Sequence, residues 1–148
     1  AGLTIELTAI NTYFIQAKMC SNWGYTKLAK HFYEESIEEM KHAEYLIDRI
    51  LFLDGVPEIA RYDVIRVGQN VKEQLDNSLK LELHAVSTYN DGIRLAVDKK
   101  DNGSREVMER ILKETEDSVD WLEAQHHVIA TIGMELYLST QTGDGEAD

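Results

Sequence analysis

The sequence predicts an all-α protein, a four-helix bundle with one long crossover between its second and third helices and a short fifth helix after the fourth. Apolar residues recur at helical spacing along four long stretches, and glycine is scarce in the middle of these stretches. The chain contains a single proline, which favours helices over a sheet. Its 148 residues fit one domain, residues 1–148, with a proper hydrophobic core.

The predicted helices follow one another with tight links except in the middle. They run over residues 3–23, 26 to about 54, about 71–97, 104 to about 132, and 134 to about 140. Thr26 and Ser104 are expected to cap the second and fourth helices. Gly55 and Gly133 end the helices that precede them. The connection over residues 55–69 is long for a turn between neighbours, so the two predicted hairpins are joined by a crossover. The chain closes with a polar tail, residues 141–148.

Composition limits the classes of partner. The formal net charge of −12 disfavours nucleic-acid binding, and it suits either metal cations or an ordinary solvated acidic surface. Cys20 is the only cysteine, so no disulfide forms within the chain, which fits a reducing compartment. No apolar run approaches the roughly 20 residues of a membrane span, and no signal peptide is evident. We therefore expect a cytoplasmic protein with no membrane partner.

Four residues in the first three helices have the types and spacing of metal ligands. Glu39 and His42 form a Glu-x-x-His pair, and Glu6 precedes them by 33 and 36 residues. In an antiparallel hairpin these intervals bring the three side chains to one level, and Glu82 lies in a similar stripe of the third helix. Carboxylates and imidazole bind iron, so the set predicts a metal site. Taken singly, each residue is as well explained as a helix-terminal charge, a surface pair or a solvated acid.

The second half of the chain repeats the spacing but not the ligand types. Counting 33 and 36 residues from Glu82 gives Thr115 and Ser118. A di-iron carboxylate bundle takes one Glu from each of two helices and a Glu-x-x-His from each of the other two. The predicted centre therefore suffices for one metal and is poor for two. Glu114 and Glu116 flank the gap but are rotated by about 100° on a helix, so we expect neither to take the bridging position without distortion.

With these residues in view, the sequence resembles the bacterioferritins. The similarity rests on ELTAINTYF (6–14), NWG (22–24), ESIEEMKHAE (35–44), RILFLDG (49–55) and VDWLE (119–123), which occur in order over nearly the whole chain. The resemblance implies a single ferritin-like domain, a ferritin-like four-helix bundle, in a family whose chains begin about a dozen residues earlier. It also implies iron storage: a 24-subunit shell takes up Fe(II), stores a ferric mineral, and releases iron by haem-mediated electron transfer.

The resemblance assigns roles at the candidate metal site. Glu6, Glu39, His42 and Glu82 correspond to ligands of the family's ferroxidase centre, at which Fe(II) is oxidised to Fe(III) by oxygen or peroxide. The family pattern expects Glu where this chain has Thr115 and His where it has Ser118. Two of six expected ligands are therefore missing, and the resemblance leaves open whether this subunit oxidises iron.

Met40 lies inside the Glu-x-x-His motif. The resemblance implies that this methionine is an axial ligand of haem b, one from each of two symmetry-related subunits. Its position one residue after Glu39 turns it by about 100° from the metal side, toward a neighbouring subunit. Candidate neighbours of the haem lie in stripes beside it: Leu7, Asn11, Phe14, Tyr33 and Ile37. A packing methionine is the plainer alternative.

The resemblance also implies partners, and the residues leave alternatives open. The expected partners are the subunits of a homo- or hetero-oligomeric shell, including a second bacterioferritin subunit type with a complete centre, and a ferredoxin reductant. The alternatives are an active ferroxidase whose atypical centre uses Glu114 or Glu116, and a purely structural or electron-transfer haem subunit. Glu35 and Glu38 line either an iron path or a solvated acidic face. The other histidines, at positions 31, 84, 126 and 127, are interpreted as surface or core residues.

Overall fold

The computed structural model describes residues 2–58 and 64–143. It contains five helices: α1 (Gly2–Trp23), α2 (Thr26–Phe52), α3 (Val71–Asp98), α4 (Asn102–Ile132) and α5 (Met134–Ser139). The predicted all-α bundle is confirmed, and the helix ends lie within two residues of their predicted positions. The last five residues of the predicted polar tail and residues 59–63 of the crossover lie outside the described part of the chain.

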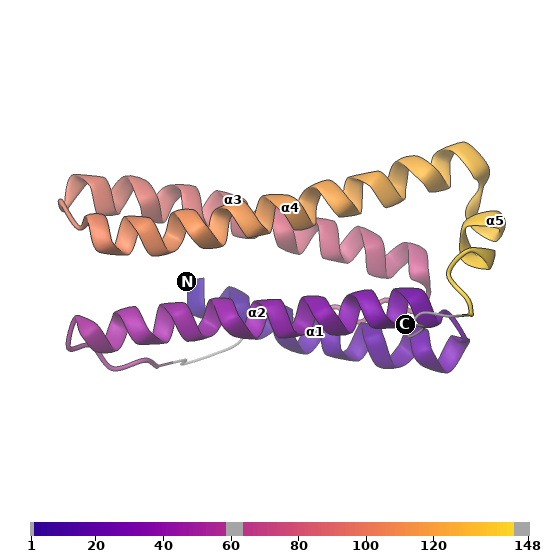
Figure 1. The fold of residues 1–148 in the computed structure, drawn as a ribbon, viewed down its shortest axis with the longest axis horizontal. Coiled ribbons are helices and arrows are strands. Elements are labelled where there is room, and N and C mark those ends of the chain that lie inside the picture. The colour runs from indigo at the N-terminus through magenta and orange to yellow at the C-terminus, as the bar shows by residue number, and fades with distance from the viewer. Residues whose placement is uncertain (1, 59–63, 144–148) are drawn as a thin grey trace.

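Two antiparallel hairpins, α1–α2 and α3–α4, stack as two layers, and α5 lies across one end (Figure 1). The end of α2 and the start of α3 are at opposite ends of the bundle, so the connection between them is the predicted long crossover. α1 packs against α2 and α3, while α2 packs against α1 and α4. α2 and α4 therefore share one face of the bundle. Among the described residues, no helix combines the length and apolar character that a membrane crossing requires.

Two of the predicted helix caps are wrong. α2 begins after Tyr25 with no side-chain cap, and the Thr26 hydroxyl instead donates to the carbonyl oxygen of Gly143. α4 begins after Asp101, whose carboxylate accepts from the Ser104 amide at 3.1 Å. Arg49 of α2 holds the Asp101 carboxylate at 2.7 Å and also donates to the Ser104 hydroxyl at 3.0 Å, contacts between hairpins that helical spacing does not reveal.

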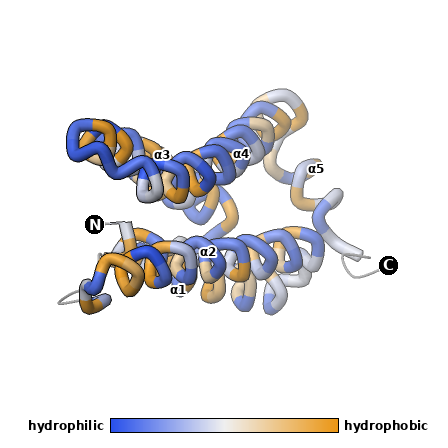
Figure 2. The backbone as a smooth tube through the Cα atoms, turned by 60° about the vertical axis from the view of Figure 1, so that its left-hand side comes forward, coloured by the Kyte–Doolittle hydropathy of each residue, from blue (hydrophilic) through white to orange (hydrophobic). Residues whose placement is uncertain are grey.

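The core consists of two apolar clusters separated by a polar layer. The first cluster occupies the half of the bundle near α5 and includes Tyr13, Phe32 and Leu122. The second, nearer the start of α1, contains Ile5, Ala85, Tyr89 and Ile111. Along α2 and α4 hydrophobic and hydrophilic residues alternate (Figure 2), as expected of amphipathic helices. The candidate metal site contributes buried polar residues to the layer between the clusters: Glu6, Glu39, His42, Glu82, Thr115 and Ser118.

Two contacts set the register of α1 against α2. The Ser36 hydroxyl donates to the carbonyl oxygen of Ile10 at 3.0 Å. The Tyr13 and Phe32 rings stack with their centroids 6.0 Å apart. This register brings Glu6 level with Glu39 and His42, as the 33- and 36-residue intervals predict.

Candidate metal centre

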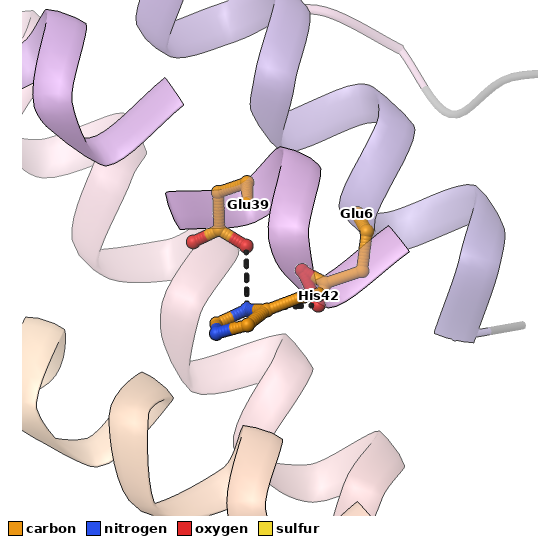
Figure 3. A group of neighbouring side chains, drawn as sticks. All are labelled: Glu6, Glu39 and His42. Atoms are coloured by element: carbon orange, nitrogen blue, oxygen red, sulfur yellow. Dashed lines mark hydrogen bonds and ion pairs between the residues drawn. The ribbon is translucent and has the colours of Figure 1, made fainter. Parts of the chain in front are cut away.

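Glu6, Glu39 and His42 meet in the middle of the bundle, where α1 contributes the first and α2 the other two (Figure 3). His42 Nδ1 lies 3.2 Å from Glu39 Oε2 and 3.4 Å from Glu6 Oε2. One ligand atom from each residue lies within 4.8 Å of the others, a spacing that one metal ion can bridge. All three side chains are buried. The structure thus brings together three of the four predicted ligands.

The fourth predicted ligand, Glu82 of α3, is buried but turned toward a different partner. The Tyr13 hydroxyl donates to Glu82 Oε2. Burial raises the pKa of Glu82 to about 8: the bond from Tyr13 opposes the shift, and the negative charges of Glu35 and Glu6 add to it. Glu82 therefore faces the same interior as the other acids without joining their group.

The buried acids hold their protons unequally. Burial would raise the pKa of Glu6, but hydrogen bonds with Glu39, His42 and Tyr89 lower it below its usual value. The pKa of Glu39 is raised well above its usual value by burial, by the charge of Glu82 and by its hydrogen bond to Glu6. The surroundings therefore favour the charged form of Glu6 and the protonated form of Glu39.

His42 is the cation at the centre of this group. Burial alone would lower its pKa, but hydrogen bonds and charges of Glu6 and Glu114 outweigh that effect and raise the pKa to about 9. The imidazolium neutralises acids that would otherwise repel one another. Its Nδ1 proton lies where a divalent cation would bind, because both satisfy the same carboxylate oxygens.

In metal-free protein, stability should fall as the pH rises from 6 to 9. The folded-state pKa values of His42 (about 9) and Glu82 (about 8) exceed their ordinary values, so their stabilising contribution is complete below the ordinary values and is lost as the pH passes 8 to 9. We expect a loss on the order of 5 kcal/mol per chain, measured by denaturant unfolding in the presence of a chelator. Glu82→Gln should reduce this loss, and equal stability at both pH values would contradict the assignment.

Two tyrosines connect the acids to the apolar clusters on either side. Tyr13 donates to Glu82, and the Tyr89 hydroxyl donates to Glu6 Oε2 at 2.8 Å. Both rings are almost fully buried, and each belongs to one of the two clusters. Helical periodicity could have predicted that these tyrosines lie beside the acids. Tyr13 lies seven residues after Glu6 and Tyr89 seven residues after Glu82, on the same helix faces.

Removing either of these hydroxyls should destabilise the protein. Tyr13→Phe leaves Glu82 buried with one donor fewer, so we expect a cost of about 1–3 kcal/mol in unfolding free energy. Tyr45→Phe is the matched control, since the half-buried Tyr45 ring packs against the Arg110 guanidinium and keeps that contact without its hydroxyl. Equal unfolding free energies for Tyr13→Phe and the control would show that the bond to Glu82 contributes nothing.

Thr115 and Ser118 of α4 lie in the polar layer and bond elsewhere. The Thr115 hydroxyl donates to the Ile111 carbonyl oxygen at 2.8 Å, within its own helix. The Ser118 hydroxyl donates to Glu35 Oε1 at 2.7 Å. Burial raises the pKa of Glu35, although the bond from Ser118 opposes this shift. The Glu35 side chain thus points into the bundle at the level of Ser118. The sequence did not reveal this contact between Glu35 and Ser118.

Glu114 contacts His42 from the side opposite to Glu6 and Glu39. Its Oε1 atom lies 2.8 Å from His42 Nε2, and Glu38 Oε2 lies 3.9 Å from the same nitrogen. Glu114 therefore approaches the metal site without entering the group that Glu6 and Glu39 form around Nδ1. Glu116 is exposed. Helix rotation explains why Glu114 does not point to the bundle centre, but it did not predict this contact.

The candidate haem residues occupy the outer face of the α1–α2 hairpin. Met40 is 46% exposed, and Phe14, Tyr33 and Ile37 are exposed large hydrophobic residues. Asn11 is exposed and Leu7 half-buried. In the observed register Leu7 lies level with Met40, and Phe14 with Tyr33. An exposed thioether among exposed apolar side chains is unfavourable in an isolated subunit and suits a covering ligand or partner.

Two of the remaining histidines, His126 and His31, contact neighbouring helices, whereas His84 and His127 are exposed. His126 Nε2 lies 2.9 Å from Asp76 Oδ1, which connects α4 to α3. The His31 ring stacks on Trp121 at a centroid distance of 3.5 Å, and burial lowers its pKa to about 4. The Asp76 contact was missed because it joins residues 50 positions apart on two helices.

Four antiparallel helices with a long middle crossover, enclosing carboxylates and a histidine halfway along, define the ferritin-like class. A family model described as a ferritin-like domain (Ferritin) matches residues 1–132. A bacterioferritin of Streptomyces coelicolor is 47% identical over 138 residues, covering 93% of this chain and 83% of the relative. Bacterioferritins of Mycobacterium leprae (44% over 135 residues, 91% and 85%) and Brucella melitensis (41% over 136 residues, 92% and 84%) are also similar. The chain belongs to the bacterioferritin family.

Proposed function

We propose that this chain is the haem-binding subunit of an iron-storage shell and that its own di-iron centre is incomplete. Membership of the bacterioferritin family supports iron storage as the function. The finer proposal is supported by the buried group of Glu6, Glu39 and His42 together with Thr115 and Ser118, two hydroxyl side chains buried on α4 where the family pattern expects a second Glu-x-x-His pair.

Fe(II) is the substrate of this site. Two carboxylates and one imidazole nitrogen supply three ligand atoms within 4.8 Å, and Glu82 is close enough for its charge to act on Glu39. Such a set binds one hard or borderline divalent cation, with water completing the coordination. A second ion beside the first would lack an imidazole and a bridging carboxylate, since Thr115 and Ser118 offer neither. Binding displaces the His42 proton, because only a neutral nitrogen can coordinate a metal.

Stopped-flow oxidation of Fe(II) in shells made only of this chain tests the incomplete centre. We expect slow oxidation without a fast phase that saturates at two irons per subunit. A fast phase with that stoichiometry would contradict the proposal and favour an active ferroxidase with an atypical centre. Mixed shells that contain a second bacterioferritin subunit with a complete centre should recover the fast phase in proportion to that subunit.

Haem b is the proposed cofactor, held between two copies of the α1–α2 face. The exposed Met40 thioether and its apolar neighbours fit a flat apolar ligand, and a two-fold axis would double every contact. Met40 would hold the haem through its thioether, and a haem held in this way would supply one-electron transfer at a raised potential. Each of the two chains would provide one sulfur ligand, that of Met40, and would exclude water with Phe14, Tyr33 and Ile37.

The proposed partners are further subunits of a 24-subunit shell and a ferredoxin that delivers electrons for iron release. Reduction of the haem by a ferredoxin, followed by the appearance of chelatable Fe(II) from loaded shells, measures this route. A haem subunit that transfers electrons without binding iron in the bundle is the remaining candidate function. It would give the haem spectrum but no metal bound at Glu39 and His42.

A further inference from the structure

The His42 imidazole meets carboxylates at both of its nitrogens. Nδ1 faces Glu39 and Glu6 at 3.2 and 3.4 Å, and Nε2 faces Glu114 and Glu38 at 2.8 and 3.9 Å. Two groups of three ligand atoms result, each within 4.8 Å: an inner group of Glu6, Glu39 and His42, and an outer group of Glu38, His42 and Glu114. Both are of a size that a single cation can bridge, and they share one residue.

The two groups differ in their access to solvent. The side chains of Glu6 and Glu39 are 1% and 2% exposed, whereas those of Glu38 and Glu114 are each 37% exposed. Glu38 belongs to α2 and Glu114 to α4, so the outer group lies at the face that these two helices share. The buried imidazole is the only member common to the surface and the bundle centre.

One imidazole cannot serve both groups at once. A neutral imidazole has one lone-pair nitrogen and one N–H, so it coordinates one cation and donates a hydrogen bond from its other nitrogen. A metal-bound histidine usually directs that N–H to a carboxylate, which orients the ring. With a cation on Nδ1, Nε2–H points at Glu114; with a cation on Nε2, Nδ1–H points at Glu39. The acids on one side of the ring therefore bind the cation when it is on that side. When the cation is on the other side, the same acids accept the imidazole N–H and orient the ring.

We propose that Glu38, His42 Nε2 and Glu114 form a second divalent-cation position, which is occupied in alternation with the inner one and through which the ion passes between solvent and the bundle centre. The proposal rests on the proposed function, in which the inner group binds iron. The outer group provides two carboxylate oxygens and one nitrogen, with open positions for water, a donor set suited to Fe(II), Mn(II) or Zn(II). Its exposure makes it the position met first by an ion from solvent.

Assembled shells of the full chain, soaked or titrated with Zn(II), Co(II) or anaerobic Fe(II), test this inference. Anomalous diffraction should place the parent protein's metal at both positions with a combined occupancy of no more than one, and calorimetry should give one tight ion per subunit. Glu114→Gln should leave density at the inner position only, and Glu39→Gln at the outer position only. Glu116→Gln, an exposed substitution two residues from Glu114, is the matched control and should behave as the parent.

The rate of binding provides a second readout. Glu114→Gln should slow Co(II) association by about tenfold, since it removes a ligand of the position that the cation meets first, while Glu116→Gln removes the same charge but no ligand and should change the rate little. Full simultaneous occupancy of both positions, or absence of outer density in both the parent and Glu39→Gln, would overturn the alternating site. Metal confined to the inner group would reject this inference but leave the proposed function standing; metal at neither position would reject both.

Discussion

Replacing Thr115 with Glu and Ser118 with His should raise the binding of Fe(II) or Co(II) from one to two ions per subunit and produce a fast phase of Fe(II) oxidation. Both positions are buried on α4, and the Ser118 hydroxyl already contacts the Glu35 carboxylate of α2. The double substitution supplies the bridging carboxylate and second imidazole of a di-iron carboxylate bundle. Binding of the second ion should tighten by at least about 100-fold, the upper range reported for losing a single orienting partner of a metal ligand.

Stability should change in opposite directions with and without metal. A further acid in a layer that already contains Glu6, Glu39 and Glu82 destabilises the metal-free protein, whereas two bound cations stabilise the loaded one. Thr115→Gln with Ser118→His is the control, because it has the same shape but lacks the bridging charge. A double variant that still binds one ion and oxidises Fe(II) at the parent rate would show that the two substitutions are not what limits this centre.

Met40→Leu should abolish haem binding in assembled shells. Each haem is expected to take one sulfur from each of two subunits, so a single substitution removes both axial ligands. Leucine keeps the size and apolar character of the side chain, and for that reason the α1–α2 face should still pair. We expect haem content to fall below about one tenth of the parent value, measured by absorbance against protein, with no change in shell size.

Two further variants separate ligation from packing. Met134→Leu, on α5 and away from this face, is the matched control and should keep its haem. Met40→His should retain haem with an altered spectrum and a lower potential, since imidazole replaces thioether. Haem bound at the parent level, with an unchanged spectrum, in Met40→Leu would mean that another residue is the ligand.

Periodicity predicted the helices and half of the site because both depend on spacing along one chain segment. The intervals of 33 and 36 residues place Glu6, Glu39 and His42 at one level of a hairpin, and the structure has them there. The cap of α4 could not be predicted in the same way: Asp101 and Ser104 are both good capping residues, and their order along the chain does not show which of them caps the helix. The orientation of Glu82 was also not predictable from spacing, because it depends on a hydrogen bond from Tyr13 on another helix.

The contacts on the second side of His42 depend on how α2 packs against α4. The carboxylate of a glutamate is three bonds from its Cα atom. It can therefore reach an imidazole even when the rotation of the helix directs the residue away from the bundle centre. Glu114 does so at 2.8 Å. Spacing within α4 gives no information about that distance, which is why the outer group emerged only from the arrangement of the helices.

The polar layer between the two apolar clusters also determines how the hairpins align along their length. A slip of α3–α4 by one helical turn, about 5.4 Å, would carry Glu82 out of reach of its tyrosine and bury it against apolar side chains. An unpaired buried acid costs several kcal/mol, whereas apolar layers tolerate such a slip with little change in buried area. The acids and the histidine therefore fix the alignment of the two hairpins along their length. In a chain that buries only leucine at this level, alignments that differ by one helical turn would have similar free energies.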